Sequence, residues 1–302
     1  MNILITGAGG FVADNLSIQL LKDKKNRVYG LGRKYSSDKV KYHKYIQGEV
    51  NYKNLKKLKF IPNIIYHCAG SGRVFQKINN KYFYDNYSSL NNVINFFSKN
   101  KIKFFFISSA AVYGDSKRLL NEMSILKPES DYGRTKVKCE KLCQKKSIFL
   151  DFKFIIIRLF SVYGKGLKKQ IFWDACKKFK NKLFTFEGTG NEQRDYIHID
   201  DAVRCLISLK NKSYKKDFNV FNVGSGKKYI IKKVLDKLRI IFGVKKIYFS
   251  NKKKVHNPDR LIANIKKIKK LGWKPKKNFD YQLKEYVKWF KKNYDNSISR
   301  ST

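Results

Sequence analysis

Short apolar segments alternate with helical segments over the first half of the chain. The strand-like runs end at glycine or polar residues and cover residues 2–6, 27–31, 45–46, 63–68, 103–107 and 152–159. The helical segments repeat apolar residues every three to four positions and cover residues 11–21, 86–98 and 132–146. Strands that alternate with helices pair in parallel, because each helix carries the chain back across the sheet. The pattern therefore predicts an α/β fold in which a parallel sheet has helices on both faces.

The second half of the chain is less regular. Helical patterns remain near residues 169–181, 200–209 and 230–242, and a loop is expected at 187–195. No internal repeat or flexible linker separates the two halves, so the boundary between them is soft. We expect a main domain over residues 1–165, to which 190–210 return, and a smaller C-terminal α/β lobe formed mainly by 166–302.

The charge of the chain raises the possibility of a nucleic-acid partner. The 302 residues include 67 Lys and Arg, and the formal net charge is +44. Only eleven of these basic residues are Arg, the residue that base-edge recognition uses most, and the lysines are scattered. No zinc-finger, RRM or KH pattern is present. We therefore expect no specific nucleic-acid partner, and only weak adhesion to polyanions at low salt.

The cysteines and the hydropathy of the chain help to predict its cellular compartment. Five cysteines are an odd number and form no CxxC pair of the metal-binding type, which fits free thiols in a reducing compartment. No apolar run approaches the roughly 20 residues needed to span a bilayer. The chain opens directly with the apolar run at residues 2–6. We expect a cytoplasmic protein without metal or membrane insertion.

A glycine-rich turn follows the first predicted strand and opens the first helix. The turn and helix start comprise Gly7, Gly9, Gly10, Phe11 and Val12, and Ala13 follows in a GxxGxxA spacing. Glycines let the backbone approach a pyrophosphate, which the helix N-terminus stabilises through its amide groups and dipole. Because the motif lies in an N-terminal βα unit, it is specific. We expect these residues to bind a dinucleotide on a Rossmann-like, doubly wound parallel sheet.

The end of the second predicted strand bears on the choice of dinucleotide. An acidic residue there would accept hydrogen bonds from the adenine ribose, but the chain has Gly32 followed by Arg33. The guanidinium of Arg33 could pair with a 2′-phosphate, or it could be one more surface cation. The sequence favours NADP, with NAD as the alternative.

The segment SDYGRTK places Tyr132 and Lys136 one turn apart on a predicted helix. Tyrosine has a pKa of about 10, so it is a poor base near neutral pH. An ammonium about 4 Å away contributes roughly 4 kcal/mol at a dielectric near 20, about three pKa units. The pair could therefore form a phenolate. Ser109, which follows the strand at 103–107, could supply a neighbouring hydroxyl at the carboxyl end of the sheet.

In this order the motifs resemble an extended short-chain dehydrogenase/reductase of the NAD-dependent epimerase/dehydratase group, which acts on nucleotide-activated sugars. The segments that carry the resemblance, besides the glycine turn and SDYGRTK, are His67–Gly70, Asn86, Glu122, Pro128, Glu140, Arg158–Gly164, Gly190–Asp201, Phe221–Gly224 and Leu271–Pro275. The resemblance covers nearly the whole chain. It implies that the C-terminal lobe binds substrate and that the protein forms a homodimer through the helices at 86–98 and 132–146.

The resemblance also assigns residues to roles. It implies that Ser109, Tyr132 and Lys136 are catalytic, and that Tyr132 and Lys136 also contact the dinucleotide together with Ala69 and Asn86. The residues implied to bind the nucleoside diphosphate sugar are Ser109, Ser161, Arg194 and Arg260. Ser161 replaces a common asparagine. His256 stands where the family usually has arginine, so one phosphate contact is expected to be weakened or moved to Arg260.

Three functions remain open from the sequence. The first is an epimerase, similar to UDP-glucose 4-epimerase, that acts by hydride transfer at a hexose carbon, expected to be C4. The second is an NADPH-dependent 4-ketoreductase of a nucleotide-activated 4-keto-deoxysugar, which Gly32 and Arg33 favour. Dehydration is not expected, because Ala111 and Val112 replace the Asp-Glu pair that dehydratases use to move protons. The third and least favoured is a non-catalytic dinucleotide-binding or nucleic-acid-binding protein.

Overall fold

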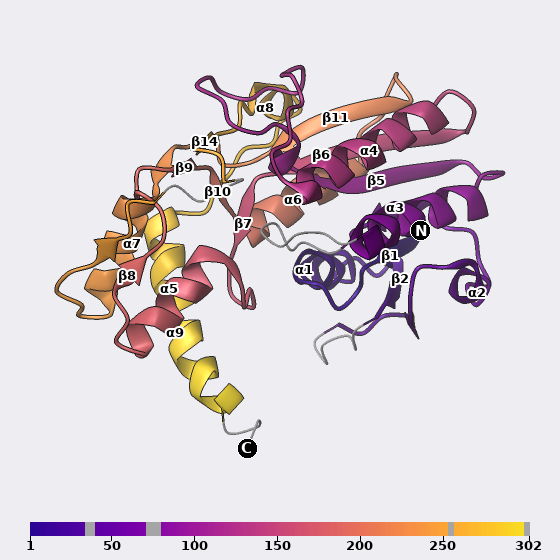
Figure 1. The fold of residues 1–302 in the computed structure, drawn as a ribbon. Helices are drawn as coiled ribbons and strands as arrows, with labels where there is room; N and C mark the ends of the chain where they lie inside the picture. Colours follow the sequence, from indigo (N-terminus) through magenta and orange to yellow (C-terminus); the bar gives the residue numbers. More distant parts are fainter. Residues whose placement is uncertain (34–39, 71–79, 253–256, 299–302) are drawn as a thin grey trace.

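The centre of the protein is a seven-stranded sheet with the strand order β11-β6-β5-β4-β1-β2-β3 (Figure 1). The computed structural model describes residues 1–33, 40–70, 80–252 and 257–298. The seven strands are β1 (Asn2–Thr6), β2 (Arg27–Gly32), β3 (Lys44–Gln47), β4 (Ile64–His67), β5 (Ile102–Ser109), β6 (Phe152–Leu159) and β11 (Phe218–Val223). Every pair of neighbours in this sheet is parallel.

Helices cover both faces of the sheet, and the side chains of each strand alternate between two apolar layers. One layer contains Ile3 and Ile5 together with α1 (Phe11–Leu20) and α6 (Ile199–Lys210). The other contains Leu4 together with the helices α2 (Tyr52–Leu55), α3 (Asn80–Phe96) and α4 (Asp131–Lys146). Burial on both faces explains why the strands read as continuous apolar runs. The predicted fold class, a doubly wound parallel sheet, is confirmed.

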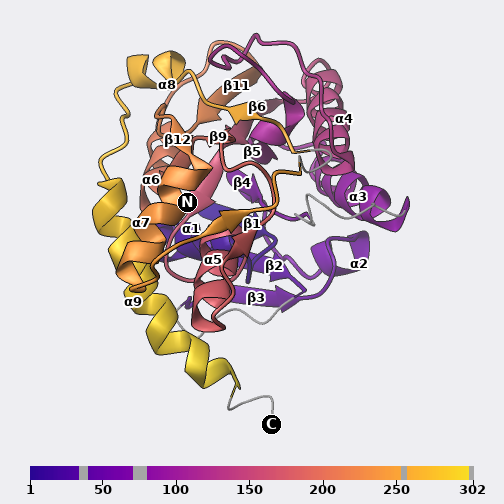
Figure 2. The same ribbon diagram turned by 60° about the vertical axis from the view of Figure 1, so that its left-hand side comes forward.

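A smaller lobe follows the sheet and is built around aromatic side chains. Its helices are α5 (Gln170–Lys180), α7 (Ile231–Ile241) and α9 (Phe279–Ile298), whose apolar faces pack together (Figure 2). Its short strands are β8 (Thr185–Phe186), β9 (Gln193–Arg194), β12 (Tyr229–Ile230), β13 (Tyr248–Phe249) and β14 (Arg260–Leu261). Although α9 is 20 residues long, no helix in the described part of the chain is both long and apolar enough to cross a bilayer.

The chain passes between the two parts more than once. After β6 the strand β7 (Ser161–Tyr163) pairs in parallel with β10 (Tyr196–His198), and α6 then returns to pack against α1. Strand β11 next joins the edge of the main sheet beside β6. The small sheet β12-β9-β14 therefore lies where the two parts meet.

Candidate active site

The glycine turn is closed against the end of β4. Gly7 has a φ of 73°, in the left-handed region that favours glycine. A Cβ added to Gly7 would lie 2.6 Å from the backbone nitrogen of Ala69, so no side chain fits between the turn and β4. Gly10 donates its N–H to the carbonyl of Gly7 at 3.1 Å and starts α1. This backbone-lined cradle at a helix N-terminus fits the pyrophosphate of a dinucleotide.

Asp14 supports the same turn and was not found by sequence reasoning. Its carboxylate accepts a hydrogen bond from the Gly9 amide at 2.8 Å, and the Tyr42 hydroxyl lies 3.5 Å away. Burial raises the pKa of Asp14, and the bonds from Gly9 and Tyr42 oppose that shift. The Asp14 carboxylate holds the Gly9 amide, and the amides of Ala8 and Gly10 bond to carbonyl oxygens, so these hydrogen bonds fix the shape of the turn.

The end of β2 excludes an acidic side chain at position 32. A Cβ added to Gly32 would lie 2.0 Å from the carbonyl oxygen of Ala8. Tyr45, on the neighbouring strand β3, donates its hydroxyl to the Gly32 carbonyl at 3.2 Å. Arg33, which follows, is exposed. The usual ribose-binding carboxylate therefore cannot be restored at residue 32 without displacing the glycine turn.

The N-terminus of α4 packs closely against the segment that follows β5. Ser130 caps the helix by accepting the Gly133 amide at 3.1 Å. A Cβ added to Gly133 would lie 2.3 Å from the carbonyl oxygen of Ala111, so glycine is required for this approach. Ser109 accepts the Ala111 amide at 3.2 Å, which leaves its own O–H for another acceptor. The first turn of α4, with Tyr132, is thereby held against the segment that carries Ser109.

Lys136 lies one turn farther along α4 and is buried, with 5% of its surface exposed. Its Nζ donates to the carbonyl oxygen of Ile107 at 2.8 Å and lies 4.7 Å from the centroid of the Phe106 ring. The same atom lies 5.8 Å from the centroid of the Tyr132 ring. No carboxylate within residues 1–33, 40–70, 80–252 and 257–298 pairs with this ammonium. A buried cation without a counter-charge is costly, which is typical of a functional site.

Residues predicted to contact the cofactor converge on this lysine from three elements. A Cβ added to Gly70 would lie 3.3 Å from Oδ1 of Asn86 and 3.6 Å from Nζ of Lys136. Asn86 is itself buried in α3, and Gly70 directly follows Ala69 after β4. The end of β4, the middle of α3 and the start of α4 therefore meet beside the glycine turn.

A buried ion pair anchors α4 to the sheet. The sequence analysis named Glu140 but did not predict that it pairs with Arg158. Arg158 on β6 pairs with Glu140 on α4, with 2.7 Å between Nη2 and Oε2. Ser108 donates its hydroxyl to the same carboxylate at 2.5 Å, and Arg158 donates to the Tyr113 hydroxyl at 2.9 Å. This network fixes the helix of Tyr132 relative to the strand that ends at Ser109.

Arg194 on β9 is nearly buried, and its guanidinium contacts the segment that contains Asn257 and Asp259. Its guanidinium donates to the Gln193 carbonyl at 2.8 Å and to Oδ1 of Asn257 at 2.5 Å. Burial lowers the pKa of Arg194. The neighbouring Asp195 does not neutralise it, because that carboxylate accepts the amide and hydroxyl of Ser225 instead. The guanidinium is therefore held by neutral oxygens.

The other predicted substrate residues lie on neighbouring strands. Arg260 on β14 is paired in parallel register with Gln193, and its guanidinium donates to the Lys117 carbonyl at 2.6 Å. Ser161 on β7 donates its amide to the carbonyl of Asp195 at 3.0 Å. Ser161 and Arg260 thus border the segment around Arg194 from two sides. His256 lies outside the described residues.

Replacing Gly133 with Ala is expected to lower turnover at least tenfold. The added methyl group meets the Ala111 carbonyl, so α4 must move away from the segment of Ser109, and a displacement of about 1 Å can cost about a hundredfold in rate. Steady-state kinetics measure the loss. Lys141→Ala on the exposed face of α4 is the control and should keep the rate. Equal rates for both variants would contradict the proposed contact.

Comparisons with known proteins show the family of the chain. A model of the "NAD dependent epimerase/dehydratase family" matches residues 3–224. The chain is 29% identical over 290 residues to the uncharacterized UDP-glucose epimerase YtcB of Bacillus subtilis, covering 90% of this chain and 92% of that protein. It is 26% identical over 326 residues to a UDP-glucose 4-epimerase of Lactobacillus helveticus, covering 96% and 97%.

A solved structure has the same fold. The UDP-glucuronic acid 4-epimerase from Bacillus cereus, in complex with UDP-glucuronic acid and NAD, superposes with a TM-score of 0.87 at 24% identity. The alignment covers 95% of this chain and 99% of that one. The family match includes the glycine turn, the strand that ends at Ser109, and the helix of Tyr132 and Lys136. The resemblance drawn from the sequence is thus confirmed, and the chain is an NAD(P)-dependent enzyme that belongs to the NAD-dependent epimerase/dehydratase family.

Proposed function

We propose that the protein is a nucleotide-sugar 4-epimerase that acts on a UDP-hexose. The observation that carries the proposal is the buried Lys136 ammonium, which lies beside the Tyr132 ring and has no carboxylate partner in the described part of the chain. The relatives named above as UDP-sugar epimerases support the substrate class. Ala111 and Val112 offer no acid or base for dehydration, which favours epimerisation within the family.

In this proposal Tyr132 moves the proton and Ser109 holds the oxygen. Tyr132 removes the proton from the sugar hydroxyl at C4, and Ser109 donates a hydrogen bond to the same oxygen. When bound, the dinucleotide would supply the chemistry that accepts a hydride from C4 and gives it back. Lys136 stabilises the phenolate of Tyr132 from a buried position, where the low dielectric strengthens the attraction. Inversion requires the keto sugar to turn over in the site, so that hydride would return to the opposite face of C4 while Tyr132 returns the proton to the oxygen.

Arg194 is proposed to bind the diphosphate. A buried guanidinium held only by carbonyl and amide oxygens keeps its full charge available for an anion. Because Asn257 already orients the guanidinium, little conformational entropy is lost on binding. Ser161 and Arg260, on the adjoining strands, are proposed to border the sugar nucleotide.

The proposal is tested by incubating the purified protein with UDP-glucose, UDP-galactose and their glucuronic acid and N-acetylated counterparts. The expected result is a C4 epimer, detected by NMR, without net consumption of added NAD or NADP. Stoichiometric oxidation of NADPH with a 4-keto sugar nucleotide would instead support the ketoreductase, which Gly32 and Arg33 favour. Absence of both reactions across the panel would refute both functions.

We also propose that the cofactor is NADP, because Gly32 takes the place of a carboxylate at the end of β2 and Arg33 follows it. Replacing Arg33 with Asp should shift the ratio of NADP to NAD affinity about a hundredfold toward NAD, since it replaces an attraction to the 2′-phosphate by a repulsion. Calorimetric titration of both dinucleotides measures the ratio. Arg118→Asp, the same charge change on an exposed loop, is the control. An unchanged ratio in Arg33→Asp would remove this assignment.

A further inference from the structure

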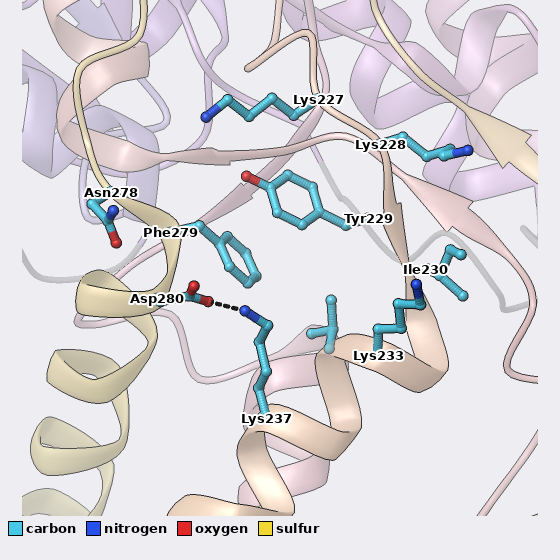
Figure 3. A pocket seen from close by; sticks show the side chains of 10 residues that line it. Lys227, Lys228, Tyr229, Ile230, Lys233, Lys237, Asn278, Phe279 and Asp280 are labelled. Carbon is cyan, nitrogen blue, oxygen red and sulfur yellow. Dashed lines mark hydrogen bonds and ion pairs between the residues drawn. The ribbon is translucent and has the colours of Figure 1, made fainter.

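A pair of joined cavities lies on the C-terminal lobe, apart from the active site. The outer cavity has a volume of about 400 Å³ and lies between β12, the start of α7 and the start of α9 (Figure 3). The inner cavity, of about 200 Å³, continues toward β7 and β10. The two share Lys227, Tyr229, Asn278 and Phe279. Neither contains a residue of the proposed catalytic or cofactor site, and α7 and α9 lie on the opposite side of the molecule from α4 (Figure 2).

The inner cavity is lined by Tyr163, whose hydroxyl no other described side chain or backbone group binds. Tyr163 is 98% buried, and its hydroxyl has no hydrogen-bond partner among the residues that the structure describes. Burial raises the pKa of this phenol, and smaller contributions come from Tyr229, Asp201 and Asp280. Tyr163 itself lines the inner cavity together with Asp201 and Tyr229, and Asp280 lines the outer one. An O–H that lines a cavity and has no protein partner is free to donate to a bound acceptor.

The carboxylates around the cavities are already occupied. Asp201 accepts the backbone amides of Lys276 and Lys277 and pairs with Arg204. Asp280 pairs with Lys237, which is the dashed contact in Figure 3. These acceptors are therefore not available to a ligand that brings its own hydrogen-bond donors.

Four ammonium groups around the cavities have no such partner. Within the described residues, no ion pair or side-chain hydrogen bond is formed by the side chains of Lys227, Lys228, Lys233 and Lys276. In Figure 3 the side chains of Lys228 and Lys233 point away from Asp280. The net charge of the cavity lining is thus positive, and its free polar groups are donors. This combination attracts an anion with several acceptor oxygens.

We propose that the joined cavities bind the phosphate group of a small phosphorylated molecule, at a site separate from the catalytic cleft. Tyr163 donates to a phosphate oxygen in the inner cavity, while Lys227 and Lys276 supply charge at its rim. The inner volume of about 200 Å³ is several times the roughly 30 Å³ that one water occupies, so a phosphate group fits. The proposal does not depend on the epimerase activity.

The probe is inorganic pyrophosphate, titrated calorimetrically into the full chain that carries Arg194→Ala and is saturated with NADP, so that neither the diphosphate site proposed in the cleft nor the glycine turn is open to the probe. One saturable site is expected. Adding Tyr163→Phe should weaken it about tenfold or more, the usual effect of losing a hydrogen bond to a charged group. Tyr163→Phe should not lower the melting temperature, because the hydroxyl has no protein partner to lose. Lys227→Ala with Lys276→Ala should also weaken binding at least tenfold.

Matched controls separate a built site from general adhesion to a basic protein. Lys24→Ala with Lys25→Ala removes the same charge from an exposed loop, and Tyr52→Phe removes an exposed hydroxyl. Both should keep the affinity. Absence of saturable binding, or equal weakening by the control lysine pair, would overturn the proposal. Unchanged affinity in Tyr163→Phe would do the same. Because turnover is not the readout, failure here leaves the proposed epimerase untouched.

Discussion

Replacing Tyr132 with Phe is expected to lower turnover about a thousandfold while dinucleotide affinity stays within about twofold, since general acid–base groups contribute about 10² to 10⁴ in rate. The substitution removes one oxygen and keeps the ring that lies 5.8 Å from Nζ of Lys136. The capping contact between Ser130 and Gly133 does not involve this side chain, so α4 should keep its position. Product formation by NMR and calorimetric titration of NAD and NADP give the two quantities.

Two further variants make this result specific. Tyr281→Phe removes the hydroxyl of an exposed tyrosine on α9 and should leave turnover unchanged. Lys136→Met should lower both turnover and dinucleotide affinity, because its ammonium lies near the phenol ring and, like the amide of Asn86, within 4 Å of a Cβ added to Gly70. Turnover of Tyr132→Phe within tenfold of the unmodified protein would remove the tyrosine from the mechanism.

The parts of this site that the sequence could predict are those set by local chain geometry. The four-residue spacing of Tyr132 and Lys136 puts both on one face of a helix whatever surrounds it, and the helix at Asp131–Lys146 confirms the predicted range at 132–146 to within one residue. The glycine turn is likewise local, because it follows one strand and opens the next helix. Such features depend on a few consecutive residues.

Other parts depend on contacts between distant segments, which no local pattern encodes. Gly133 reads as a weak helix residue until the Ala111 carbonyl is seen where its side chain would be. Arg158 and Glu140 each read as a charged residue in an apolar context, and only the pairing of β6 with α4 explains their burial. The placement of β11 beside β6 also requires the folded sheet, since residues 218–223 follow a long excursion through the smaller lobe.

Replacing Arg158 with Met is expected to lower the free energy of unfolding by about 3 to 5 kcal/mol, because it leaves the Glu140 carboxylate buried without its counter-charge. The exposed fractions of the two side chains are 6% and 4%, so water cannot replace the lost partner. Met keeps the apolar bulk of the arginine stem, which limits the loss from packing. Urea unfolding, followed by circular dichroism, measures the difference.

Strand β6 offers a matched control at its other end. Lys153 pairs with Asp217 there, but its side chain is 34% exposed and that of Asp217 54% exposed, so Lys153→Met should cost at most about 1 kcal/mol.

Adding Glu140→Leu to Arg158→Met should recover most of the loss, because no buried charge is left without a partner. Equal losses for the two single variants would mean that the ion pair does not hold α4. A lower turnover in the double variant at restored stability would show that the pair also positions Tyr132, since stability alone would then no longer explain the rate.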